Sequence, residues 1–369
     1  MRMTLAALVR LSVLVMIGLC VVAVGLGRMS GPPLTLHTLS PSHHVLAPKH
    51  LFNFQGYDPH FFDTESGRLQ RLELSKGEQL DMATCSPWED EQGERQVAGR
   101  WSNRTGRDQD LVPHQFGLGR FTFPGGQPIN RVATRIIPHS PVCWFPDTSA
   151  RVLFVGGDRQ IYRFCFEGAG GTDGGCDLEP QALAWEVEPP DNGEVMFGDL
   201  AWPTEPALGG RMLVSLFLIE SRDLQVPRRR SELWWLQPDP DGSRIIAAGR
   251  FTNPEPTEND QRMPTVARSA EGAPVLAYLT QEPGANDWQL RVAPLRFDPK
   301  TGIPQVHASE AKVLAEDCAM VPLTVSRDSR TITCIQQKYE GGPPIIGRLN
   351  VPLVAHETPR NDVLTDSRP

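Results

Sequence analysis

The feature that most constrains the fold of this chain is a β-rich unit that recurs about every sixty residues. One copy, "CWFPDTSARVLFVGGDRQIYRFCFE", runs from Cys143 to Glu167. A polar turn with Pro and Asp precedes the β-rich run 151–155, and a Gly-Gly-Asp turn then leads into the run 160–167, where apolar residues alternate. Pro presets φ and Gly reaches positive φ without steric cost, so the pattern predicts short strands joined by tight turns.

Similar segments occur on both sides of this copy. The equivalent positions are spaced by 56, 58, 64 and 59 residues, and they are Trp88, Trp144, Trp202, Val266 and Val325. An earlier copy fits "YDPHFFDTESGRLQRLEL" from Tyr57, which brings the number of units to six. The apolar residues follow a period of two rather than 3.6, so no long helix is predicted after residue 30.

Six sheet units of about four short strands each predict an all-β, six-bladed β-propeller over residues 51–352. Radial packing buries both faces of each unit and leaves only short sheet edges. The last unit is one strand short, and "PLTLHTLS" from Pro33 could supply that strand. We expect residues 353–369 to form a disordered C-terminal tail.

The motif resembles the repeat of TolB-like, WD40-like six-bladed propellers, which places Trp-Ser-Pro-Asp-Gly before one strand and Ile-Tyr in the next. The resemblance covers residues 50–352 loosely and implies a fold only, because that family includes scaffolds, periplasmic binding proteins and peptidase gating domains. No catalytic residue carries over from it. The matching residues are Trp144, Pro146, Asp147, Ile161 and Tyr162 in one unit, Asp328 in the last, and Trp88 and Trp202 as marks of two others.

The N-terminus predicts export across a membrane. Residues 11–27 carry no charge, and a helix of about 20 apolar residues spans a bilayer. Arg2 and Arg10 precede this run, which favours a cytoplasmic N-terminus. We therefore expect residues 1–29 to be a signal anchor or transmembrane helix, residues 30–50 to be a tether, and the propeller to be periplasmic. A cleaved secretory peptide is the alternative.

Six cysteines follow Cys20, and an even number outside the cytoplasm suggests disulfides. Two pairings are favoured by locality. Cys165 and Cys176 flank a Gly-rich turn, and Cys318 and Cys334 are expected on successive strands of a hairpin. Cys85 and Cys143 are interpreted as buried thiols.

The sequence assigns no catalytic, cofactor-binding or metal-binding residue. It has no phosphate loop, zinc-protease motif or nucleophile elbow. The net charge of −8 and scattered basic residues disfavour nucleic acid as a partner, and the basic run 228–230 is interpreted as a solvated loop. Most of the N-terminal histidines, such as His43 and His44, lie in the expected tether.

The preferred interpretation is a membrane-tethered, non-catalytic module that binds a protein or envelope component through a propeller face. The alternative is an extracytoplasmic hydrolase or lyase acting on glycans, with carboxylates at the mouth of the propeller channel. Asp199, Glu205 and Glu194 are the carboxylates considered in one unit, and Glu89 and Asp90 in another. Carboxylates that converge at the channel would favour the enzyme, and a neutral channel would favour binding.

Overall fold

The structure is a computed structural model, and its described part is all-β. The only helical segments in that part are two 3-10 turns, Pro206–Leu208 and Ala308–Glu310, and no helix in it is long and apolar enough to cross a membrane. The all-β prediction is therefore confirmed, whereas the expected helix within residues 1–29 lies outside the described residues. These residues are 43–46, 60–63, 69–89, 94–103, 115–123, 125–146, 150–166, 179–186, 196–203, 205–220, 228–251, 259–320, 322–325, 329–336 and 345–352.

The described strands lie in one compact body, Thr38–Pro369, and pair into six antiparallel units in chain order. The first three units are β1 (His43–Leu46), β2 (His60–Asp63) and β3 (Leu69–Arg71); then β4 (Glu78–Cys85), β5 (Arg95–Asn103), β6 (Gln115–Phe123) and β7 (Pro128–Ala133); then β8 (Cys143–Trp144), β9 (Arg151–Val155), β10 (Ile161–Cys165) and β11 (Gln181–Ala182).

Units four to six complete the series. A single pairing, Cys318 with Gln336, joins units five and six into one continuous sheet. The strands are β13 (Met196–Ala201), β14 (Met212–Glu220), β15 (Arg228–Pro238) and β16 (Arg244–Arg250), with β12 (Ala184–Trp185) parallel to β16; then β17 (Asp260–Arg268), β18 (Pro274–Gln281), β19 (Trp288–Phe297) and β21 (Lys312–Cys318), with β20 (Pro304–Val306) beside β19; then β22 (Thr324–Val325), β23 (Thr331–Gln336) and β24 (Ile345–Asn350).

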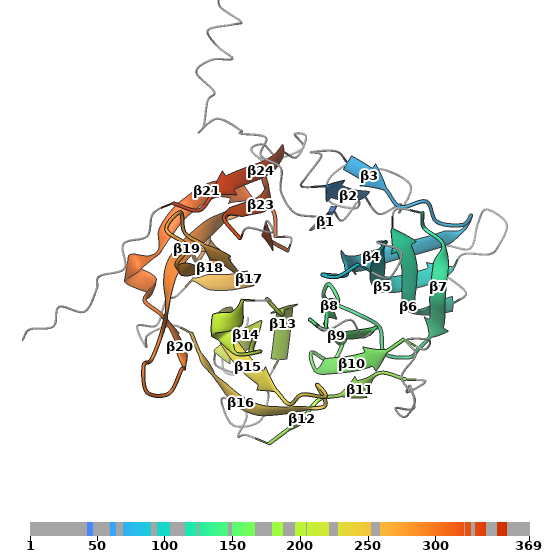
Figure 1. Ribbon diagram of the computed structural model, residues 1–369, viewed down its shortest axis with the longest axis horizontal. Helices are drawn as coiled ribbons and strands as arrows, with labels where there is room; N and C mark the ends of the chain where they lie inside the picture. The colour runs from blue at the N-terminus through green and yellow to red at the C-terminus, as the bar shows by residue number, and fades with distance from the viewer. Residues whose placement is uncertain are drawn as a thin grey trace, which may run out of the picture. The chain divides into compact units, whose positions relative to one another are not determined.

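Each apolar core lies between two consecutive units, and the units follow one another around a common centre (Figure 1). β9 shows how one strand serves two cores. Val152 and Phe154 pack toward unit two, whereas Leu153 and Val155 pack toward unit four. Because both faces of this sheet are buried, β9 is continuously apolar from Val152 to Val155, which differs from the period of two that the sequence predicts. This packing is that expected of a β-propeller.

The five equivalent positions of the repeat, here called the repeat marks, occupy similar places in their units. Trp144 ends β8, while Trp88 and Trp202 follow β4 and β13 within three residues. Val266 and Val325 lie on β17 and β22. All five therefore mark the first strand of a unit. Pro146 is exposed, and Asp147 and Asp328 lie outside the described residues.

The tight turns use the chemistry that the sequence predicts. In the turn between β15 and β16, the Asp239 carboxylate accepts hydrogen bonds from the backbone and hydroxyl of Ser243, at 2.7 and 2.8 Å. Gly242 then takes a φ of 64°, which a residue with a side chain rarely adopts. Gly156 and Arg159 close the β9–β10 hairpin by a backbone hydrogen bond, as expected for the Gly-Gly-Asp turn.

Two details differ from the sequence interpretation. The sequence predicts a solvated loop at the basic run 228–230, but this run begins β15, because the antiparallel ladder with β14 continues as far as the pairing of Arg228 with Glu220. β1 falls within the expected tether, 30–50, and pairs with β2. The described part of the last unit has three strands, as predicted, whereas the strand proposed from Pro33 lies outside the described residues.

Candidate functional site

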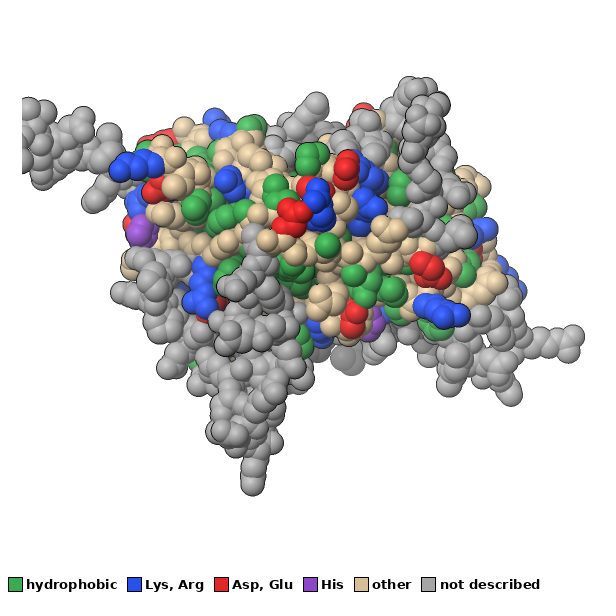
Figure 2. Space-filling view, turned by 90° about the horizontal axis from the view of Figure 1, so that it is seen from below, with side chains coloured by type: hydrophobic (Ala, Val, Ile, Leu, Met, Phe, Trp, Pro, Cys, Tyr) green, Lys and Arg blue, Asp and Glu red, His purple; other side chains and the backbone are tan. Residues whose placement is uncertain are grey.

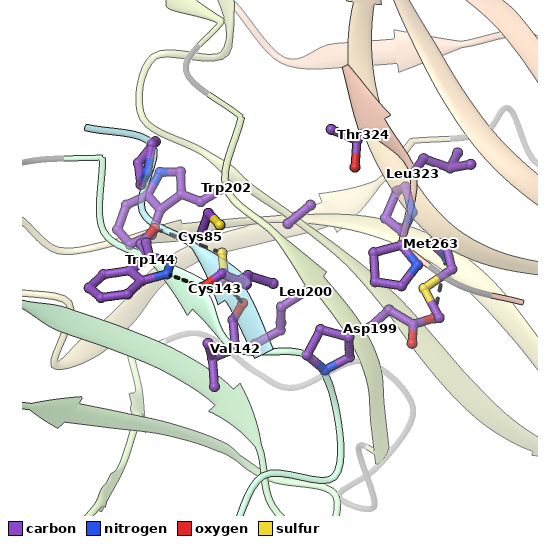
Figure 3. Close-up of a pocket in the computed structure, with 16 residues that line it drawn as sticks. Cys85, Val142, Cys143, Trp144, Asp199, Leu200, Trp202, Met263, Leu323 and Thr324 are labelled. Carbon is purple, nitrogen blue, oxygen red and sulfur yellow. Dashed lines mark hydrogen bonds between the residues drawn. The ribbon is translucent and has the colours of Figure 1, made fainter. Parts of the chain in front are cut away.

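A pocket of about 220 Å³ lies where the first strands of units two to six meet. Figure 3 shows Trp144, Cys85 and Cys143 on one side of it and Met263, Leu323 and Thr324 on the other. Its lining residues come from β4, β8, β13, β17 and β22 or directly adjoin them, and they are Thr84, Cys85, Pro87, Pro141, Val142, Cys143, Trp144, Asp199, Leu200, Ala201, Trp202, Met263, Pro264, Pro322, Leu323 and Thr324.

β-Bulges shape the strands that border the pocket. The pairing of β4 with β5 shifts between Asp81 and Thr84, and the pairing of β17 with β18 shifts between Arg262 and Thr265. Within these bulges Met82 and Met263 take φ values of 48° and 50°. A bulge bends its strand and redirects side chains. The bulged residue Met263 is itself part of the pocket lining.

Two tryptophans form the aromatic part of the wall, and both indole N–H groups already have acceptors. Trp144 Nε1 donates to the carbonyl oxygen of Thr84 at 3.1 Å, and Trp202 Nε1 donates to that of Gly210 at 3.1 Å. The ring of Trp202 also packs on Phe145, with centroids 4.9 Å apart. The tryptophans therefore offer the pocket apolar ring surface rather than hydrogen-bond donors.

The remaining wall is mostly apolar and neutral. It includes four prolines, which have no backbone N–H to donate: Pro87, Pro141, Pro264 and Pro322. Burial raises the pKa of the Cys143 thiol to about 12, and burial also raises the pKa of Cys85. Both sulfurs therefore stay protonated at neutral pH, since the charged thiolate is disfavoured away from water.

Asp199 is the one charged residue of the lining given above, and its charge is matched by Arg262. The Arg262 guanidinium donates from Nε to Oδ2 at 2.5 Å and from Nη2 to Oδ1 at 2.9 Å. Ser215 Oγ donates to the same Oδ2 at 2.9 Å. The carboxylate is buried and fully occupied, so the described wall presents no uncompensated charge.

The carboxylates that the sequence singled out do not share this pocket. Glu205 binds Arg268 through both oxygens, at 2.8 and 3.0 Å, and it is not among the lining residues. Glu89 is exposed and lies 3.7 Å from Arg95. Glu194 and Asp90 lie outside the described residues. Of this set, the described structure brings only Asp199 to the pocket.

The other candidate residues take several positions. In the part of the chain that the structure describes, no three His, Cys, Asp or Glu side chains gather as metal ligands would. Cys318 lies on β21 and Cys334 on β23, and their thiols are hydrogen-bonded to each other. They belong to neighbouring units rather than to one hairpin. The Cys165–Cys176 pairing cannot be followed, because Cys176 lies outside the described residues.

Sequence reasoning missed the pocket as a site, although it found the repeat that builds it. Leu200, Met263 and Leu323 are ordinary apolar residues in the sequence. Each lies within three residues of a repeat mark, at Trp202, Val266 and Val325. That proximity was the available signal, because equivalent strands of a radial fold face the same centre.

The sequence matches no protein-family model and no curated protein, so the resemblance to TolB-like repeats gains no support. Similar solved structures include a Mycobacterium tuberculosis puromycin-hydrolysing peptidase, at 14% identity and a TM-score of 0.40, over 69% of this chain and 36% of that one. This chain thus spans about a third of the length of that peptidase.

Two further similar structures cover more of their own chains. One is an endo-arabinase from Bacteroides thetaiotaomicron, at 10% identity and a TM-score of 0.35, over 86% of this chain and 95% of that one. The other is an α-L-arabinofuranosidase of Fusarium graminearum with arabinobiose, at 13% identity and a TM-score of 0.36, over 77% and 85%. All three TM-scores are below 0.5, so the account of the fold rests on strand pairing and packing.

Proposed function

We propose that this chain is a six-bladed β-propeller whose central pocket binds an uncharged, mostly apolar chemical group, and that it acts as a non-catalytic binding module. The observation that carries the proposal is the composition of the pocket wall. Tryptophan, leucine, methionine, proline and protonated thiols line it, and its one carboxylate is held in a buried ion pair. Closure of the ring between units six and one is part of the proposal.

The volume of the pocket limits what can enter it. A dry, apolar cavity of about 150 Å³ holds a benzene molecule. At about 220 Å³, the pocket suits a single aromatic ring with short substituents, or one apolar end of a larger ligand. A sugar fits this wall less well, since each buried hydroxyl without a hydrogen-bond partner costs about 1–3 kcal/mol.

A direct test is ligand-observed NMR by saturation transfer to the full chain. Indole and p-cresol serve as neutral probes, and benzoate serves as the charged one. We expect transfer to the neutral probes, and a loss of affinity of at least tenfold in Leu200→Glu, which places a charge in the pocket. Ile246→Glu is the control, because Ile246 is 41% exposed on β16 and lies outside the lining. Equal binding to both variants, or transfer to benzoate alone, would argue against the proposal.

A glycan hydrolase or lyase is the second candidate function. What favours it is that Asp199 lines the pocket, and a catalytic acid or base must reach its substrate. Arabinan and arabinobiose are suitable assay substrates, because they match the arabinose-acting enzymes named above. Sugar release that persists in wild-type protein and disappears in a folded Asp199→Asn variant would replace the binding proposal with this one.

Membrane attachment and an envelope partner also belong to the proposal. They are supported by the uncharged run 11–27 and the flanking arginines. We expect the full chain to stay with membranes after an alkaline carbonate wash, and added protease to digest the propeller in intact spheroplasts. Release into the soluble fraction at full length would contradict the anchor.

A further inference from the structure

Cys318 and Cys334 form an unusual pair, because they come from different units and meet inside a core. Cys318 ends β21 and Cys334 lies in the middle of β23. Both belong to the apolar core between units five and six, and they are 5% and 1% exposed. The backbone brings them together, since Cys318 pairs with Gln336, whose side chain lies on the same face of β23 as that of Cys334.

The two sulfurs are chemically unequal. The two thiols are hydrogen-bonded to each other, and the backbone N–H of Leu290 is hydrogen-bonded to the sulfur of Cys318. The Cys318 S–H itself donates to the carbonyl oxygen of Glu316 at 3.8 Å. The hydrogen bonds with Cys334, first, and with Leu290 lower the pKa of Cys318. The thiolate is the nucleophile of disulfide exchange, so one of the two cysteines must lose its proton before the pair can be oxidised.

The chain between these cysteines carries a wall of the pocket. Pro322, Leu323 and Thr324 line the pocket and follow Cys318 within six residues. Thr324 also pairs with Thr333, which directly precedes Cys334. A covalent bond between the two sulfurs would therefore close a loop of about 15 residues that contains this wall.

We propose that Cys318 and Cys334 form a disulfide under oxidising conditions, and that this bond restrains the part of the pocket wall formed by Pro322–Thr324. The oxidant is a small disulfide such as glutathione disulfide. The thiolate of one cysteine attacks one of its sulfurs and expels one glutathione thiolate. The other cysteine then loses its proton to solvent, attacks the cysteine sulfur of this mixed disulfide and expels the second glutathione thiolate. Two thiols are oxidised while one glutathione disulfide becomes two glutathione molecules.

Burial determines when this exchange takes place. At 5% and 1% exposure the sulfurs are shielded in the folded protein, so the bond forms during folding or transient opening and then resists reductants. The full chain should therefore be refolded either in a glutathione redox buffer or in excess dithiothreitol, blocked with iodoacetamide, and digested with trypsin without reduction.

The expected result needs no substitution and no ligand. The peptides 313–327 and 331–338, which hold Cys318 and Cys334, should appear joined after refolding in the redox buffer and separate after dithiothreitol. Full alkylation of both cysteines in the redox buffer, or linkage of either to another cysteine, would overturn the proposal.

Hydrogen exchange tests the restraint separately. In wild-type protein, a peptide that contains Leu323 and Thr324 should exchange roughly tenfold more slowly in the oxidised form than in the reduced one. In Cys318→Ala the two conditions should give the same rate, which controls for effects of the buffer. A linked pair without slower exchange would refute the restraint. Only the functional importance of the Pro322–Thr324 wall rests on the proposed function. If the NMR probes failed to bind, the expected peptide linkage and the expected hydrogen-exchange rates would be unchanged.

Discussion

Two ion pairs cross the seam, or boundary, between units four and five, whereas the hydrogen bonds that join the first strands of units two and three across their seam are neutral. Across the first, Asp199 binds Arg262 and Glu205 binds Arg268. Across the second, Thr84 Oγ1 donates to the carbonyl oxygen of Val142 at 2.8 Å. The backbone N–H of Val142 donates to the carbonyl oxygen of Met82 at 3.0 Å, and the Trp144 indole donates to that of Thr84.

The two kinds of contact differ less in the net stability they contribute than in the stability lost when one partner is removed. A buried ion pair adds little net stability over apolar residues of the same volume, but removal of one partner leaves a buried charge without compensation. A neutral hydrogen bond loses about 1 kcal/mol when one partner is removed. Both seams contribute residues to the same pocket. A single substitution in the charged seam should therefore disturb the pocket more than one in the neutral seam. Charges of both signs also lie interspersed on the side of the molecule shown in Figure 2, where water weakens such pairs.

The largest effect is expected from Asp199→Ala. It should lower the free energy of unfolding by about 3–5 kcal/mol, because Arg262 is only 14% exposed and loses its counter-ion. Urea denaturation followed by circular dichroism measures the loss. The double variant Asp199→Leu/Arg262→Met is the control, and we expect it to recover most of the stability. A double variant as unstable as the single one would show that the charge itself stabilises the seam.

The seam between units three and four depends on close packing at Gly242, and we expect a substitution there to have an intermediate effect on stability. A Cβ at this position would lie 2.2 Å from Cζ of Phe145 in unit three, and φ is 64°. Gly242→Ala should therefore cost about 2–3 kcal/mol in urea denaturation, from backbone strain and overpacking together. Gly272→Ala is matched to it, since Gly272 has a φ of 85° but open space around the added Cβ. We expect about 1 kcal/mol for that control, and equal losses would remove packing from the explanation.

The neutral seam should respond more weakly. Thr84→Val keeps the shape of the side chain but removes the hydroxyl that donates to Val142, so we expect a loss of about 1 kcal/mol in the same measurement. Thr84→Ser retains the hydroxyl and should lose less than Thr84→Val. A loss from Thr84→Val as large as that from Asp199→Ala would erase the contrast between the seams.

The smallest effect on stability is expected at Asp239, whose carboxylate stabilises the turn between β15 and β16 within one unit rather than a seam between units. Burial acts to raise the pKa of Asp239, but hydrogen bonds from Ser243 and Arg244 outweigh it and lower the pKa from 3.8 to about 2. A lowered folded-state pKa gives stability that is complete above the unfolded value and is lost as pH falls from about 4 to about 2. Because Arg244 is half exposed, we expect no more than about 1 kcal/mol.

The measurement for this case is the stability difference between wild type and Asp239→Asn as a function of pH. It should be constant from pH 7 to about pH 5 and should shrink as pH falls toward 2. A difference that stays constant down to about pH 2, or grows below pH 4, would contradict the role of the ionised carboxylate.

The sequence predicts the repeat but not the contacts between its copies. Turn residues such as Gly156 and Gly242 and the β-rich runs beside them are local signals, so six sheet units could be recognised from them. The seams depend on residues about 63 positions apart, such as Asp199 and Arg262, and no local pattern links these. For the same reason the sequence suggests Asp199 and Glu205 as possible neighbours, whereas in the structure each binds its own arginine.

The central claim is that the first strands of consecutive units enclose an apolar binding pocket. The most direct test is a crystal structure of the full chain soaked with iodobenzene, with iodine located by its anomalous signal. We predict one strong iodine peak between Trp144, Leu200 and Met263, with the strands of six units around it. Iodine found only on the outer surface, or first strands that do not meet around a shared pocket, would contradict the account.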